Sequence, residues 1–156
     1  MEMKTSGPDE KKVSQLAKDL NELLANFQVY YQNLRSVHWN IKGKNFFVLH
    51  EKFEELYNDA QEKIDLVAER ILTLGETPIH TYSDYLNSAR IPVGKNVSKD
   101  EHAVKLIAES IKELLEIERE ILDKSDRADD EGTNAMMSDF ISEQEKTLWM
   151  LKSWLA

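Results

Sequence analysis

The chain has 156 residues, a net charge of −9 and no cysteine. This length suits one domain of ordinary size, and the absence of cysteine excludes disulfides, thiolate zinc sites, iron–sulfur clusters and thiol catalysis. The longest unbroken apolar runs have four residues (46–49 and 148–151), whereas a membrane span needs about 20. Residues 1–12 lack the apolar stretch of a secretory signal peptide. We therefore expect a cytoplasmic protein with no membrane contact.

Acidic residues concentrate between residues 100 and 131, where twelve of them stand against five Lys or Arg residues. An acidic surface repels nucleic-acid phosphates and attracts cations. A solvated helix face explains the same charge, so both interpretations stay open from charge alone.

Apolar residues recur at helical spacing almost from the start of the chain. The first predicted helix runs from about residue 9 to residue 39, preceded by a flexible segment, residues 1–8. Lys42-Gly43-Lys44 breaks the pattern, and Asn45 is available to cap a second helix that ends before Gly75.

The remaining turn-forming residues gather in a long crossover, residues 76–98, where residues 82–90 predict one short helix. Ser98-Lys99-Asp100-Glu101 has the pattern of a capping box and opens the third long helix. An acidic loop follows, and Thr133 is predicted to cap the fourth helix. No strand pattern is present. We therefore predict an all-α four-helix bundle of ferritin-like layout over residues 9–156, with a short helix in the crossover between the second and third long helices.

Five potential metal ligands lie between residues 38 and 69. His38 continues the inward-facing series 27, 31, 34, 38 of the first helix. The other four share an arc of about 100° on the second helix: His50, Glu54, Asp65 and Glu69. Taken singly, each has an ordinary explanation as a hydrogen-bonded core histidine or a solvated acid. As a set, they suggest a metal centre.

The spacing of these five residues along the chain indicates that one metal site would need ligands from two chains. Fifteen residues separate His50 from Asp65, or about 22 Å along a helix, so both cannot bind one metal ion within one chain. Two copies of the second helix packed antiparallel about a two-fold axis would solve this, with the axis near residues 59 and 60, where small Ala60 permits close approach. Each site would then take His38, His50 and Glu54 from one subunit and Asp65 and Glu69 from its mate. Two imidazoles and three carboxylates suit Fe(II).

Three short motifs in this region resemble the Dps family, the mini-ferritins. They are His38-Trp39-Asn40-Ile41-Lys42-Gly43, then Asn45-Phe46-Phe47 followed by His50-Glu51, and Ala68-Glu69-Arg70. The resemblance implies a hollow homododecamer built from two-fold dimers, with ferroxidase centres at the dimer interfaces. It also implies oxidation of Fe(II), preferably by hydrogen peroxide, storage of ferric mineral and protection against oxidative stress.

The family's ligands fall on the same five residues: His38, His50, Glu54, Asp65 and Glu69. Glu54 departs from the pattern, because the family commonly has Asp there, and the extra methylene moves the carboxylate. Trp39 resembles a tryptophan beside the centre, although aromatic packing at the helix end explains it equally. Related proteins carry acidic iron-entry pores at the start of the last helix, and the candidates here are Asp126, Asp130 and Glu131. Helix capping or plain solvation explains these three acids nearly as well.

Two other functions compete with this interpretation. The first is condensation of DNA, which in the family is often served by a lysine-rich tail. Residues 1–15 have a net charge of zero, so we expect DNA binding to be weak or absent. The second is a non-enzymatic helical bundle that serves as an interaction module, which would leave the spacing of the five ligand residues as a coincidence.

Overall fold

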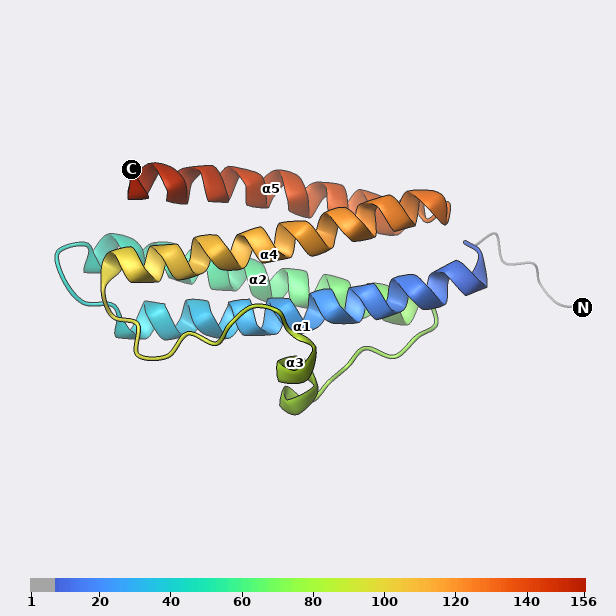
Figure 1. The fold of residues 1–156 in the computed structure, drawn as a ribbon, viewed down its shortest axis with the longest axis horizontal. Coiled ribbons are helices and arrows are strands. Elements are labelled where there is room, and N and C mark those ends of the chain that lie inside the picture. The colour runs from blue at the N-terminus through green and yellow to red at the C-terminus, as the bar shows by residue number, and fades with distance from the viewer. Residues whose placement is uncertain (1–7) are drawn as a thin grey trace, which may run out of the picture.

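The computed structural model describes residues 8–156, and its regular structure there is helical apart from one isolated bridge between Lys42 and Lys99. The helices are α1 (Glu10–Asn40), α2 (Phe46–Thr73), α3 (Tyr82–Ser88), α4 (Asp100–Arg127) and α5 (Glu131–Leu155). The four long helices lie alongside one another, and α3 packs against α1 on the outside of the bundle (Figure 1). This confirms the predicted fold class. Most of the expected flexible segment, residues 1–7, lies outside the described part of the chain.

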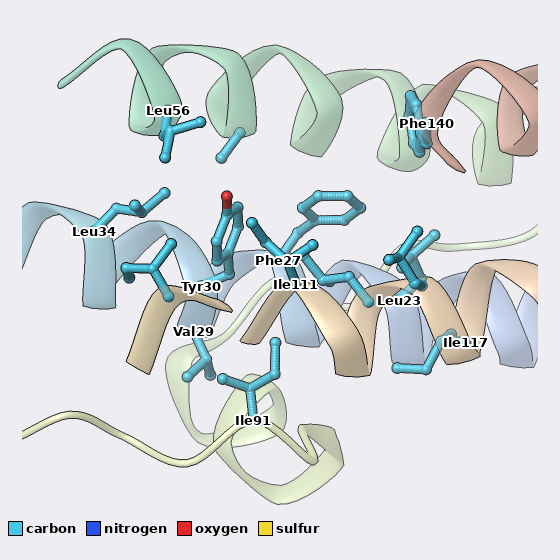
Figure 2. Packing of buried hydrophobic residues seen from close by; sticks show 14 of the residues in the cluster. Leu23, Phe27, Val29, Tyr30, Leu34, Leu56, Ile91, Ile111, Ile117 and Phe140 are labelled. Carbon is cyan, nitrogen blue, oxygen red and sulfur yellow. The ribbon is translucent and has the colours of Figure 1, made fainter. Parts of the chain in front are cut away.

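The apolar faces of the four long helices meet in one core (Figure 2). Phe27 of α1 and Phe140 of α5 pack edge to face with their ring centroids 5.8 Å apart. The crossover contributes buried Ile91, which lies beside Val29 of α1. Burying each such side chain stabilises the fold by about 1.5–3 kcal/mol. Among residues 8–156, no helix is long and apolar enough to cross a membrane.

Three asparagines on α1 hold the crossover in place. The side-chain oxygen of Asn26 accepts hydrogen bonds from the backbone N–H groups of Arg90 and Ile91, at 2.9 and 3.0 Å. The side-chain oxygen of Asn21 accepts the N–H of Ile79, and that of Asn33 accepts the N–H of Gly94. The short helix α3 therefore ends at Ser88 rather than at residue 90, because the next amides bond to α1 instead of continuing the helix.

The predicted start of α4 was wrong, whereas α2 starts directly after Asn45 as predicted. The capping box at Ser98 does not form, because the Ser98 carbonyl accepts the N–H of Lys42 at 2.9 Å in an extended pairing. Helix α4 consequently begins at Asp100, whose carboxylate accepts a hydrogen bond from the Asn45 side chain at 2.7 Å. Asn45 occupies the cap position of α2, but its side chain is engaged in this bond to α4 and makes no capping bond.

The cap of α5 is Asp130 rather than Thr133. Thr133 lies three residues into the turn, where its backbone N–H donates to the Asp130 carboxylate at 3.1 Å and its hydroxyl donates at 2.5 Å. A carboxylate at the cap position satisfies exposed amides and favours the positive end of the helix dipole.

Candidate metal centre

The last turn of α1 and the first turn of α2 bring His38 and His50 together. The loop between them, residues 41–45, is anchored by buried Ile41 and turns at Gly43, whose φ of +117° favours glycine. The two imidazole rings stack nearly parallel, with centroids 3.8 Å apart and an interplanar angle of 10°. His38 is buried and His50 is half-buried. The structure therefore pairs the two histidines that the sequence singled out.

Each histidine is oriented by the backbone of the other. Nδ1 of His38 lies 2.6 Å from the carbonyl oxygen of His50, and Nδ1 of His50 lies 2.7 Å from the carbonyl oxygen of His38. A carbonyl oxygen only accepts hydrogen bonds, so both Nδ1 atoms carry the proton. Both Nε2 atoms then keep a lone pair available for a metal ion, which is how protein backbones commonly prepare histidine ligands.

Glu54 lies one helical turn beyond His50, on the exposed side of α2. Its carboxylate accepts a hydrogen bond from the hydroxyl of Tyr57 at 3.4 Å. The Tyr57 ring meets the His38 ring edge to face, with centroids 5.3 Å apart. Partial desolvation and the charge of Glu54 raise the pKa of Tyr57, so its hydroxyl keeps its proton at neutral pH. Tyr57 is not among the residues predicted for the site, although its position one turn after Glu54 was a usable signal.

Asp65 and Glu69 lie further along α2, and both are exposed on the face that also carries Glu54. Within residues 8–156 of a single chain, no three His, Asp or Glu side chains gather closely enough to hold a metal ion. The structure thus pairs the histidines, places Glu54 nearby and leaves Asp65 and Glu69 apart from them.

The expected role of Ala60 is corrected by the structure. Ala60 is fully buried in the core of its own bundle, on the same face of α2 as Phe53 and Val67. It therefore cannot provide close approach between two copies of α2, because its methyl group points at the neighbouring helices of its own chain. The exposed residues at this level of α2 are polar: 58, 59, 61 and 62.

Trp39 is 55 % exposed at the end of α1. The guanidinium of Arg35 lies over its ring, 4.7 Å from the centroid, and also over the ring of Tyr31 at 5.4 Å. Such cation–π contacts order exposed aromatic side chains. They give Trp39 a packing role within this chain.

The three candidate pore acids occupy different environments. Asp126 and Glu131 are exposed, whereas the side chain of Asp130 is only 1 % exposed and forms an ion pair with Arg70 of α2 at 2.6 Å. The Arg70 guanidinium lies against Gly132, where an added Cβ would come within 2.7 Å of it. Helix capping, one of the interpretations left open by the sequence, accounts for Asp130.

Comparison with known proteins shows the family to which this chain belongs. The family model described as a ferritin-like domain matches residues 17–156. The chain is 41% identical over 152 residues to the DNA protection during starvation protein of Porphyromonas gingivalis, covering 97% of this chain and 96% of that one. It is also 50% identical over 151 residues to an uncharacterised protein of Haemophilus influenzae, covering 96% of this chain and 94% of the relative.

Solved structures of Dps proteins have the same fold as this chain. A crystal structure of the Dps protein from Vibrio cholerae, described as a member of a superfamily of ferritin-like diiron-carboxylate proteins, superposes with a TM-score of 0.96 at 47% identity, covering 100% of this chain and 98% of that one. The Dps protein from Bacillus brevis gives a TM-score of 0.91 at 37% identity, covering 99% and 100% of the two chains. The chain belongs to the Dps family of ferritin-like proteins.

Proposed function

We propose that this protein is a ferroxidase and iron store, which oxidises Fe(II) with hydrogen peroxide and keeps the ferric product as mineral. The observation that carries the proposal is the stacked histidine pair, in which both Nε2 atoms are available as ligands while both Nδ1 atoms are bonded to backbone carbonyls. Because main-chain oxygens engage both Nδ1 atoms, Nε2 is the nitrogen that each imidazole can offer to a metal ion.

The centre is completed by a second copy of the chain. One subunit supplies His38, His50 and Glu54, and its partner supplies Asp65 and Glu69 from the exposed face of α2. Membership of the Dps family supports this arrangement, and so does the distance along α2 that keeps the two halves apart in one chain. The assembly that we propose is a hollow homododecamer of two-fold dimers, working in the cytoplasm.

The residues fit iron as a substrate. Imidazole nitrogen binds Fe(II), and carboxylate oxygen suits the harder Fe(III), so a mixed set can hold the metal before and after oxidation. Two Fe(II) ions each give one electron to one molecule of hydrogen peroxide, and the O–O bond breaks without release of a hydroxyl radical. The two Fe(III) ions then react with water to form ferric oxyhydroxide, and four protons are released for each peroxide consumed.

Complementation between two inactive variants tests the shared site. We expect the assembled wild type to oxidise anaerobically loaded Fe(II) rapidly on addition of stoichiometric peroxide, and His50→Ala and Asp65→Ala each to lose this rate. Dissociating and reassembling the two variants together should restore part of the activity, since some mixed dimers would hold one intact site. Glu116→Ala, which removes an exposed acid of α4 outside the proposed set, serves as the control.

A wild-type rate no greater than that of free Fe(II) would overturn the ferroxidase proposal. The intersubunit arrangement would be overturned if either single variant kept its activity. It would also be overturned if the mixed variants recovered none.

A further inference from the structure

Two polar side chains meet inside the otherwise apolar joint between α4 and α5. Glu118 of α4 is 0 % exposed and Gln144 of α5 is 5 % exposed. The side-chain amide of Gln144 donates a hydrogen bond to Oε1 of Glu118. Their other two oxygens, Oε2 of Glu118 and Oε1 of Gln144, are buried and have no hydrogen-bond partner among the described residues. Leaving such atoms unpaired costs about 1–3 kcal/mol each.

One proton would satisfy both unpaired oxygens. A carboxylic acid and a carboxamide form a ring of two hydrogen bonds, in which the acid O–H donates to the amide oxygen and the amide N–H donates to the acid carbonyl. Gln144 already makes the second of these bonds. We propose that Glu118 is a neutral carboxylic acid paired with Gln144 in such a ring, so that the joint between α4 and α5 is a proton-binding site.

Among the described residues, the cations around Glu118 are already paired with other carboxylates, so none is left to hold it as an anion. From α2, buried Lys63 bonds to the carboxylates of Asp59 and Glu143 at 2.6 and 2.7 Å. Burial alone would lower the pKa of Lys63, but these two hydrogen bonds raise it overall, so the ion pairs stay intact. On α4, Arg119 is exposed and pairs with Glu145 of α5. The positive charges nearest to Glu118 are thus already neutralised.

The remaining long helix, α1, contributes Tyr30, which is buried beside this cluster. Its pKa is raised by burial and by the charges of Asp59 and Glu118, so it stays neutral. Burial likewise raises the pKa of Glu118 to about 8, although the bond from Gln144 and the charges of Lys63 and Arg119 oppose the rise. A protonated Glu118 at neutral pH agrees with the geometry of the pair.

The proton gives the fold a pH dependence of definite sign. In the unfolded chain Glu118 titrates near its ordinary value of 4.5, and in the folded chain near 8. The stabilising contribution of the neutral pair is therefore fully present below about pH 4.5 and is lost progressively as the pH rises to about 8. If the proposed iron oxidation operates, the acid that it releases would strengthen this joint. The proton site itself does not depend on that activity.

Infrared spectroscopy on the wild-type assembly tests the protonation directly. We expect a carboxylic acid C=O band at pH 6 that shifts when glutamate is isotopically labelled and disappears above about pH 8. Glu118→Gln should lack this band, whereas Glu116→Gln, which removes an exposed charge two residues away on α4, should keep it. Absence of a labelled acid band in the wild type at pH 6 would show that Glu118 is ionised and would overturn the proposal.

Stability measurements give an independent readout. In Glu118→Gln an amide N–H replaces the acid O–H as donor to Gln144. We therefore expect its free energy of unfolding in urea at pH 5 to equal that of the wild type. Between pH 5 and 8 the equilibrium constant for folding of the wild type should fall, relative to that of this variant, by about tenfold per pH unit. Parallel pH profiles for the wild type and Glu118→Gln would overturn the proposal. Failure of the variant to fold would leave the labelled infrared band to decide.

Discussion

Tyr57 connects the two ligand-bearing turns of the candidate centre. Its hydroxyl donates to Glu54 and its ring edge lies against His38, so one side chain touches ligands from both α1 and α2. Glu54 has one more rotatable bond than the aspartate common in the family. A hydrogen bond from Tyr57 restricts that extra freedom and holds the carboxylate on the side of the histidines.

We expect Tyr57→Phe to weaken binding of Co(II), a redox-stable substitute for Fe(II), by about tenfold, as is usual when a group that orients a metal ligand is removed. The ring contact with His38 is kept, so only the hydrogen bond is lost. Calorimetric titration of the assembled protein measures the effect, and Tyr31→Phe removes a hydroxyl from the adjacent ring as a control. In a Glu54→Ala background, Tyr57→Phe should have no further effect. Equal losses in both backgrounds would contradict this coupling.

At the scale of single residues, the sequence predicted the histidine pair but not its geometry. Helical spacing was enough to turn His38 inward and to place His50 on the ligand face. The exchange of hydrogen bonds depends on the backbone path of residues 41–45, which no periodicity encodes. Glu118 and Gln144 did carry a signal, because each interrupts an apolar series (111, 114, 115, 118, 121 and 137, 140, 144, 148, 151).

The crossover is held by hydrogen bonds rather than by its own secondary structure. Asn26 is fully buried, and its side-chain oxygen receives two backbone N–H groups of the crossover while its amide donates to the Glu22 carbonyl at 2.9 Å. An asparagine is suited to this position because one side chain offers both an acceptor and a donor. Asn21 and Asn33 each accept one N–H of the crossover, and their amides donate to crossover carbonyls, those of Thr77 and Pro92.

We expect Asn26→Ala to lower the free energy of unfolding by about 2–4 kcal/mol, since one buried and one partly buried amide lose their acceptor. Asn58→Ala, at an exposed position of α2, should change it by about 0.5 kcal/mol or less. Urea unfolding followed by circular dichroism compares the two variants. A loss below 1 kcal/mol for Asn26→Ala would mean that solvent readily replaces the asparagine.

At the scale of helices, the periodicity of apolar residues was sufficient to predict the number and order of the elements. The bounds of α1 and α2 agree with the prediction, but the starts of α4 and α5 do not, because distant partners determine them. The Ser98 carbonyl accepts a hydrogen bond from the N–H of Lys42. The Asp130 carboxylate accepts hydrogen bonds from Arg70 and from Thr133. Ala60 was assigned to an interface although its place in the apolar series already indicated the core.

The whole molecule is strongly acidic, with a net charge of −9 for each chain. A dodecamer would multiply this charge twelvefold before any iron is bound. Binding to duplex DNA depends on Lys and Arg contacts to phosphates, and repulsion at this charge opposes it. Lys12, one of the few cations near the N-terminus, already donates to the carbonyl of Arg127 at 2.9 Å.

We therefore expect no retardation of duplex DNA in gels run at about 0.15 M salt. A variant with a basic N-terminal segment, Glu2→Lys with Glu10→Lys, should retard DNA in a salt-dependent way and shows that the assay can detect binding. Retardation by the wild type that persists at this salt concentration would contradict the prediction and indicate a local lysine patch.

The exchange of hydrogen bonds between His38 and His50 has a consequence for the order of events during biogenesis. Both acceptors are main-chain oxygens of the same chain, so the imidazole pair takes its shape when the single chain folds. The loss of side-chain freedom needed to aim two nitrogen ligands is then complete before any second chain arrives. In the proposed intersubunit centre, association would have only carboxylates left to position, because a newly folded subunit would already present the two nitrogen ligands.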